Sequence, residues 1–133
     1  EIDLLRRVPM FGRLSPLVLE TLAADLVSMD VDGGVTVVRE GDRGDSLYLI
    51  AEGEFIVEKS GRQLARLGPA DVFGEIALLY DVARTATVRS LDSARVYILG
   101  GQQFLRAMGA TGDAKLAARG LADSRLDEQG SGR

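Results

Sequence analysis

Hydrophobic positions near the start of the chain repeat every three or four residues, the spacing of amphipathic helices. Ser15-Pro16 precedes the segment "LVLETLAADL". Serine followed by proline is a frequent helix start, because the serine side chain accepts a hydrogen bond from a backbone amide that lacks a partner within the helix. The residues on one face of this helix would be Val18, Leu19, Leu22 and Leu26. Residues 1–7 are expected to form a shorter helix before it.

From Val27 to Leu99 the pattern changes to short runs rich in Val, Ile, Leu, Tyr and Phe, separated by glycine-containing turns. The turns are "DGG", "EGDRGD", "EGE", "SGR" and "LGP". Closely spaced strand and turn signals predict an all-β sandwich or barrel, with glycines taking positive φ at the turns. Period-two alternation places side chains on the two faces of three strands. One face would carry the inward-pointing apolar residues Val35 with Val37, Phe55 with Val57, and Val96 with Ile98. The other face would carry Thr36, Ile56, and Arg95 with Tyr97.

After Leu99 the pattern becomes helical again. The segment "GQQFLRAM" predicts one helix, and Asp113 to Glu128 predicts a second, weakened by Gly120 at a cost of about 1 kcal/mol relative to alanine. Residues 129–133 are expected to be a disordered tail. We find no internal repeat and no linker. The predicted fold is mainly β with flanking helices in one domain over residues 1–128: helices in 1–26, a β-roll in 27–99 and helices in 100–128.

Composition narrows the function classes. At 133 residues the chain can bury one core, and 46% hydrophobic with 27% charged residues is typical of a globular protein. A net charge of −4 argues against nucleic acid as a partner. The chain has neither cysteine nor histidine, so disulfides, zinc clusters and histidine-based catalysis are excluded, and we expect neither a metal site nor an enzyme. The apolar runs fall short of the roughly 18 residues needed to cross a bilayer. The start at Glu1 without methionine indicates a piece of a longer protein.

The stretch "FGEIALLYDVARTATVRS" carries the candidate chemistry. The segment "EIALL", placed between two β-segments, can form a single helical turn whose first amides lack partners and favour an anion. Gly74 allows close backbone approach, and Arg84 offers a guanidinium fork for two phosphate oxygens. Glu75 would repel a phosphate unless it accepts a hydrogen bond from another part of the ligand, such as a sugar hydroxyl. These residues together predict a pocket for a ribose phosphate.

The segment "FGEIALLYDVARTATV" resembles the phosphate-binding cassette of the cyclic nucleotide-binding domain family. That family includes bacterial catabolite-activator-type regulators, regulatory modules of cyclic-nucleotide-dependent kinases, and channel and transporter domains. The upstream "REGDRGDSLYLIAEGEFIV" is similar to the family's glycine-punctuated β-roll, so the likeness covers most of Leu4 to Met108. It implies a double-stranded β-helix, jelly-roll-like, with N-terminal helices and C-terminal B and C helices.

The resemblance also implies the roles of single residues. Glu75 would bind the ribose 2′-hydroxyl, and Arg84 would pair with the cyclic phosphate. Backbone amides around Gly74, Ile76 and Ala77 would hold the phosphate oxygens, and Thr85 would add backbone and hydroxyl contacts.

Three features of the sequence bear on this resemblance. Ala83 stands where a proline often precedes the arginine, and no aromatic residue after Phe104 is present to stack on the base. In the family, a threonine or serine at the position of Thr85 can reach the amino group of a guanine, so cyclic GMP stays open. Many members with a hydroxyl at this position nevertheless prefer cyclic AMP, which is therefore expected first.

The function expected from the resemblance is a non-catalytic, cytoplasmic regulatory domain. Cyclic nucleotide would rearrange the helices from Gln102 to Glu128 and act on an output domain outside this chain. The resemblance leaves open a membrane transporter or channel as the parent, with this domain on its cytoplasmic side. The alternative is a family member that binds no nucleotide and acts as an interaction or assembly module.

Individually, the residues also have simpler interpretations. Arg84 could form a surface ion pair, and Glu75 could stabilise a helix N-terminus by its charge. The acidic pair in "GDRGD" is a turn rather than a calcium loop. Apolar and aromatic residues expected to serve the core rather than the pocket are Phe73, Ile76, Leu78, Leu79, Tyr48 and Tyr97.

Overall fold

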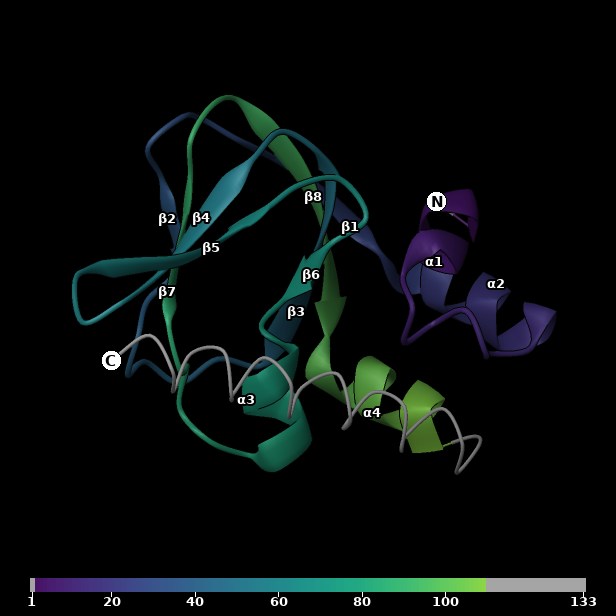
Figure 1. Cartoon of the computed structure of the whole chain (residues 1–133). Helices are drawn as coiled ribbons and strands as arrows, with labels where there is room; N and C mark the ends of the chain where they lie inside the picture. Colours follow the sequence, from purple (N-terminus) through teal and green to yellow (C-terminus); the bar gives the residue numbers. More distant parts are fainter. Residues whose placement is uncertain (1, 110–133) are drawn as a thin grey trace.

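The computed structural model describes residues 2–109, which form two antiparallel sheets with helices on one side and at one end (Figure 1). The elements are α1 (Ile2–Arg7), α2 (Pro16–Asp25), β1 (Val27–Val31), β2 (Thr36–Val38), β3 (Ser46–Glu52), β4 (Phe55–Lys59), β5 (Arg62–Leu67), β6 (Val72–Phe73), α3 (Glu75–Tyr80), β7 (Thr87–Ser90), β8 (Ala94–Gly100) and α4 (Gly101–Gly109). The predicted fold class is confirmed. The helix predicted over Asp113 to Glu128 and the tail 129–133 lie outside the described residues.

Each sheet has four strands, in the orders β1-β8-β3-β6 and β2-β7-β4-β5. Strand β3 separates two cores, because its alternate side chains point to opposite faces. Leu47 and Leu49 join the core under the helices, whereas Ile50 and Tyr48 face the interior between the sheets. Both faces of β3 are therefore covered, which explains why this strand reads as an unbroken apolar run.

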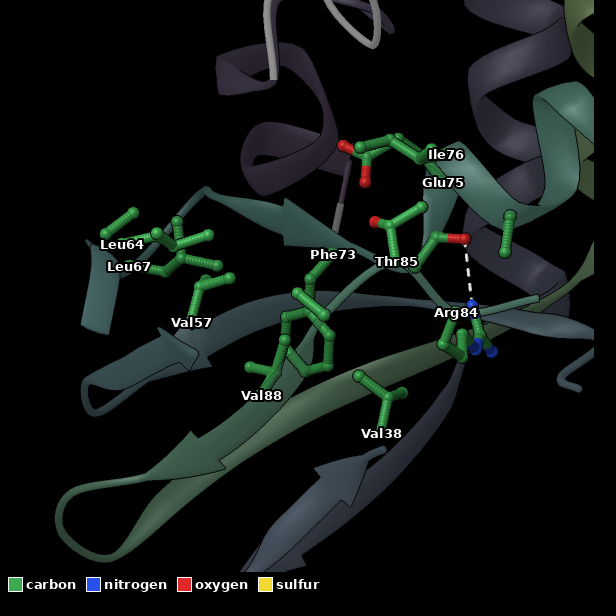
Figure 2. Close-up of a pocket in the computed structure, with 14 residues that line it drawn as sticks. Val38, Val57, Leu64, Leu67, Phe73, Glu75, Ile76, Arg84, Thr85 and Val88 are labelled. Carbon is green, nitrogen blue, oxygen red and sulfur yellow. Dashed lines mark hydrogen bonds between the residues drawn. The ribbon is translucent and has the colours of Figure 1, made fainter. Parts of the chain in front are cut away.

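The roll core lies between the two sheets. Its buried members are Val31, Val38, Ile50, Phe55, Val57, Leu67, Phe73, Ala86, Val88, Ala94 and Val96, and several of them appear in Figure 2. The predicted inward positions of Phe55 with Val57, and of Val96 with Ile98, are confirmed, although Ile56 on the opposite face is buried as well.

The prediction for Val35 is wrong. Val35 precedes β2 and is 41% exposed, whereas Val38 is buried in the roll core. The pairing of β2 with β7 shifts register between Thr36 and Val38. Such a bulge breaks the period of two, so Val38 joins the roll core beside Val37, which is partly buried against it, while Val35 stays outside.

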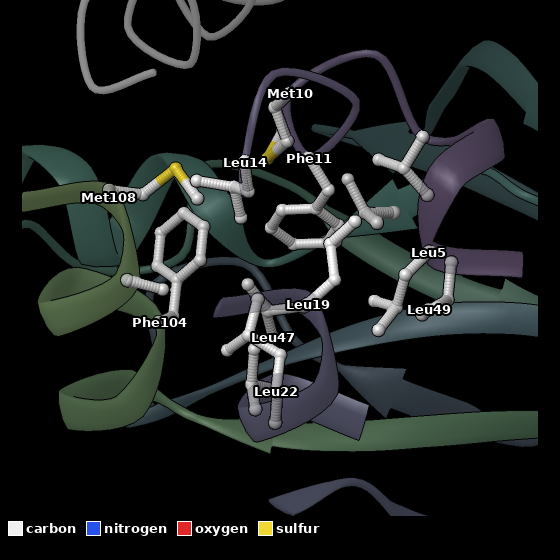
Figure 3. Close-up of a cluster of buried hydrophobic side chains, with 14 of the residues drawn as sticks. Leu5, Met10, Phe11, Leu14, Leu19, Leu22, Leu47, Leu49, Phe104 and Met108 are labelled. Carbon is white, nitrogen blue, oxygen red and sulfur yellow. The ribbon is translucent and has the colours of Figure 1, made fainter. Parts of the chain in front are cut away.

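The helical core lies between the β3–β8 face and helices α1, α2 and α4 (Figure 3). Phe104 of α4 is fully buried and meets Phe11 edge-on, with ring centroids 6.2 Å apart. Helix α2 starts as predicted, since the Ser15 hydroxyl accepts a hydrogen bond from the Val18 amide at 3.3 Å. All residues of its predicted apolar face lie against this core: Val18, Leu19, Leu22 and Leu26.

The prediction of a glycine at positive φ is wrong for the turn "LGP", where Ala70 (φ 71°) rather than Gly68 has positive φ. It is confirmed in the other four turns by Gly34, Gly41, Gly53 and Gly61, and Gly74 before α3 also has positive φ. Gly44 is not among them, so a left-handed backbone does not explain glycine at that position. Among the described residues, the helices are all too short or too polar to cross a membrane.

Candidate functional site

Helix α3 lies between β6 and β7 and is one residue longer than the predicted segment "EIALL". Gly74 precedes it with φ 93° and ψ −8°, and no side chain caps the helix start. A Cβ at Gly74 would lie 2.7 Å from Arg84 Nη1 and 3.0 Å from the Ser46 carbonyl oxygen. Glycine is therefore required here both by the backbone angle and by the arginine packed against it.

Arg84 is held at both its backbone and its side chain. Its amide donates to the Asp42 carbonyl at 2.9 Å, and its carbonyl accepts from the Gly41 amide at 2.8 Å. Its Nη1 donates to the Gly74 carbonyl at 2.9 Å and its Nη2 to the Ser46 carbonyl at 2.8 Å. The guanidinium thus has a fixed place before any ligand contacts it.

The charge of Arg84 is buried without a bonded carboxylate. The residue is 6% exposed, and it forms no ion pair within residues 2–109. Burial lowers the pKa of its guanidinium, whereas Tyr48, Asp45 and Glu75 oppose this by favouring the charged form. Two neutral carbonyls satisfy part of the hydrogen-bonding capacity of the five guanidinium N–H groups, but they do not neutralise the charge. Buried charges are generally paired, so the arrangement favours an anion beside Arg84.

An open pocket lies beside Arg84. All residues that the sequence predicted for the site line it: Gly74, Glu75, Ile76, Ala77, Arg84 and Thr85. Strands β4, β5 and β7 contribute an apolar wall that includes Val57, Leu67 and Val88 (Figure 2). The pocket therefore combines one cationic end with one apolar surface.

Glu75 is the first residue of α3 and is 2% exposed, although its carboxylate is ionisable. Thr85 follows the clamped arginine and is half-buried. Figure 2 shows both side chains with Arg84 around the same pocket, so an acceptor, a hydroxyl and a cation all border it. The simpler interpretation of Arg84 as a surface ion pair is wrong, because the residue is buried and unpaired within the described chain.

Two apolar side chains expected to serve the core, those of Phe73 and Ile76, also border the pocket. Phe73 is 2% exposed, stacks on Tyr48 at a centroid distance of 5.0 Å and lines the pocket. Ile76 belongs to the helical core and lines the pocket as well. Leu79 is buried as expected, whereas Leu78 is only partly buried.

Sequence reasoning missed the residues that hold Arg84 and those that form the apolar wall. Ser46 and Asp42 act through backbone carbonyls, which no side-chain motif reveals. The period-two pattern indicates that Val57 faces inward, but not that it borders the open end of the roll. Within the described residues, no group of three side chains of types that ligate metals comes together.

Comparison with known proteins adds an independent test. The family model for the cyclic nucleotide-binding domain matches residues 29–111. The chain is 40% identical over 92 residues to the cGMP-dependent protein kinase, isozyme 1, of Drosophila melanogaster, covering 68% of this chain and 12% of that protein. It is 39% identical over 107 residues to the cAMP-dependent protein kinase regulatory subunit of Yarrowia lipolytica, covering 79% of this chain and 28% of that protein.

Solved structures agree with this match. The regulatory domain of Toxoplasma gondii PKA, co-crystallised with cAMP, superimposes with a TM-score of 0.81 at 32% identity, covering 94% of this chain and 48% of that one. The regulatory subunit of a cAMP-independent protein kinase A from Trypanosoma brucei gives a TM-score of 0.76 at 26% identity, covering 81% and 40%.

The chain spans only a minor part of these kinases and regulatory subunits, so it is similar to one domain of each. The glycine-bounded strands, the short helix α3 and the buried Arg84 all lie within the matched segment. The chain therefore belongs to the cyclic nucleotide-binding domain family.

Proposed function

We propose that this pocket binds a 3′,5′-cyclic nucleotide as a regulatory ligand, cyclic AMP first, with cyclic GMP as the alternative base. The observation that carries the proposal is the buried guanidinium of Arg84, fixed by two carbonyls and bordering an open pocket. A cyclic phosphodiester bears one negative charge on two free oxygens, which matches a guanidinium that keeps further donors available.

The other polar groups match the rest of the ligand. The amides around Gly74, Ile76 and Ala77, at the uncapped start of α3, would donate to the phosphate oxygens. Glu75 would accept from the ribose 2′-hydroxyl, which gives a carboxylate a favourable partner beside an anion. Thr85 would contact the ligand next to the phosphate. The apolar wall from β4, β5 and β7 would cover the base or the sugar.

The choice of base depends on Thr85 in this proposal. Its hydroxyl can accept from the amino group of a guanine, so a preference for cyclic GMP has a physical route. The relatives differ in this respect, because one is named for cGMP and the other for cAMP. Measuring the affinity of the wild-type chain and of a Thr85→Ala variant for both nucleotides would distinguish a preference for cyclic GMP from a preference for cyclic AMP.

The output of this non-catalytic domain would be a protein kinase catalytic domain. The relatives reported above are a kinase and kinase regulatory subunits, which favours that class over the transporter or channel that the resemblance left open. One contact between the pocket loop and α4 supports a route for the signal. The Gly101 amide at the start of α4 donates to the Asp45 carbonyl at 2.6 Å, next to Ser46, whose carbonyl holds Arg84. Ligand at Arg84 would therefore act on α4 through one short loop.

The competing possibility is that this chain is a family member that does not bind cyclic AMP, since a similar T. brucei subunit belongs to a cAMP-independent kinase. Equilibrium binding to cyclic AMP, cyclic GMP, 5′-AMP and adenosine decides between them. We expect a cyclic nucleotide to bind more tightly than 5′-AMP and adenosine. No detectable binding of either cyclic nucleotide would contradict the proposed function.

A further inference from the structure

Gly44 lies directly against the guanidinium of Arg84. A Cβ built at Gly44 would lie 2.2 Å from Nη2, 2.5 Å from Nε and 2.6 Å from Cζ of that arginine. Each of these distances is shorter than two non-bonded heavy atoms tolerate. Any side chain at position 44 must therefore displace the guanidinium or the loop that carries it.

The backbone does not explain glycine at this position. The two glycines of "EGDRGD" differ, since Gly41 has φ +88° with open space around its missing Cβ, whereas Gly44 has no positive φ. Gly41 thus serves the turn. Gly44 is constrained by the arginine that packs on it, forty positions later in the chain.

The guanidinium has little freedom to yield. Its Nη1 and Nη2 are bonded to the Gly74 and Ser46 carbonyls, the first of which is drawn in Figure 2. The arginine backbone is bonded to Asp42 and Gly41 of the same loop. Moving the side chain away from position 44 would break at least one carbonyl contact.

We infer that Gly44 is a positioning residue whose missing side chain keeps the Arg84 guanidinium at the pocket. Its effect on ligand affinity rests on the proposed function, whereas its packing against Arg84 does not. The assignment gives a distinct task to a glycine of the loop that precedes β3.

The matched control is Gly68, which likewise has no positive φ and has open space where its Cβ would lie. We expect Gly44→Ala to weaken cyclic nucleotide binding by at least about tenfold, while Gly68→Ala stays within about twofold of the wild type. Wild-type affinity in Gly44→Ala would overturn the inference.

A ligand-free double-mutant cycle distinguishes this inference from the proposed function. Thermal unfolding is measured for the wild type, Gly44→Ala, Arg84→Ala and the double variant. We expect Gly44→Ala to lower Tm in the wild type but not in the Arg84→Ala background, where no guanidinium is displaced. Equal lowering in both backgrounds would overturn the inference, even if the chain binds no nucleotide.

If Gly44→Ala alone does not fold, the double variant tests whether Gly44 positions Arg84. Folding of Gly44→Ala/Arg84→Ala with the Tm of Arg84→Ala supports the positioning role, because removal of the arginine then relieves the clash. Failure of the double variant to fold, while Arg84→Ala folds, would overturn it.

Discussion

At the scale of single residues, the pocket separates two charges that would otherwise neutralise one another. Arg84 and Glu75 both border the pocket and are both buried, yet no ion pair joins them. The guanidinium is instead held by carbonyls of Gly74 and Ser46. Such an arrangement leaves donors of the guanidinium available to an anionic ligand, with the Glu75 carboxylate at the border of the same pocket. A cyclic nucleotide offers both groups within one small molecule.

Replacing Glu75 by alanine tests the acceptor. We expect the variant to bind the ribose nucleotide more weakly and the 2′-deoxy analogue with unchanged affinity, because the analogue lacks the hydroxyl that the carboxylate accepts from. Competition binding with both ligands measures this difference. Glu20→Ala, at an exposed position of α2, is the control and should change neither affinity. Equal losses for the two ligands in Glu75→Ala would contradict the role of Glu75.

The pH dependence of ligand binding follows from the charge state of the Arg84 guanidinium. Burial lowers the pKa of the Arg84 guanidinium below its ordinary value, and deprotonation would weaken anion binding as pH rises through that pKa. Arginine nevertheless stays charged in proteins, and the chain has no histidine. We therefore expect affinity to be constant between about pH 7 and 9. A steep fall across this range, measured by titration at several pH values, would disagree with a guanidinium as the phosphate partner.

At the scale of elements, sequence reasoning succeeded where a local rule decides the outcome. Helix α2 begins after Ser15-Pro16 because both residues favour a helix start without help from the rest of the fold. The predicted order of helices, strands and the short helix α3 is likewise confirmed up to Gly109. The register of β2 was not predictable, because the bulge that brings Val38 inward depends on its pairing with β7.

The candidate site shows the same division. Gly74, Glu75 and Arg84 stand out in the sequence because their residue types and spacing fit an anion and a sugar. The partners of Arg84 do not, since Asp42 and Ser46 contribute only backbone carbonyls. The contact of Gly44 with Arg84 joins positions far apart in the chain and depends on how the loop before β3 pairs with the segment before β7.

The cap of α2 provides a prediction for one element. Ser15→Ala removes the acceptor for the Val18 amide and should lower the free energy of unfolding by about 1 kcal/mol. Ligand affinity should not change, because Ser15 does not line the pocket. Denaturant unfolding and nucleotide titration of the same variant measure both quantities. Ser93→Ala, at an exposed turn position, serves as the control. A loss of affinity in Ser15→Ala would contradict the separation of cap and pocket.

At the scale of the whole molecule, two cores share the strands β3 and β8. Leu47, Leu49 and Leu99 face the helical core, whereas Ile50 and Val96 face the roll core. Neither core can lose its order without exposing one face of these strands. The helical layer and the roll should therefore unfold together as one cooperative unit.

Phe104→Ala tests this coupling from the helical side. The side chain is fully buried against Phe11, so its truncation should cost about 3–5 kcal/mol of unfolding free energy. The unfolding midpoints measured by far-ultraviolet circular dichroism and by tyrosine fluorescence should shift by the same amount, because Tyr48 lies in the roll and Tyr97 lies against the helical core. Separate transitions for the two signals would show that the cores unfold independently.

The most direct test of the central claim is calorimetric titration of the wild type and Arg84→Ala with cyclic AMP and cyclic GMP. Arg95→Ala is the matched control, because that arginine is exposed, does not line the pocket and pairs with Asp30 on the neighbouring strand β1. We predict that the wild type and Arg95→Ala bind at least one nucleotide with equal affinity. Arg84→Ala should lose about 2–5 kcal/mol of binding free energy. Unchanged affinity in Arg84→Ala, or no binding by the wild type, would contradict the claim that a buried guanidinium captures a cyclic phosphate.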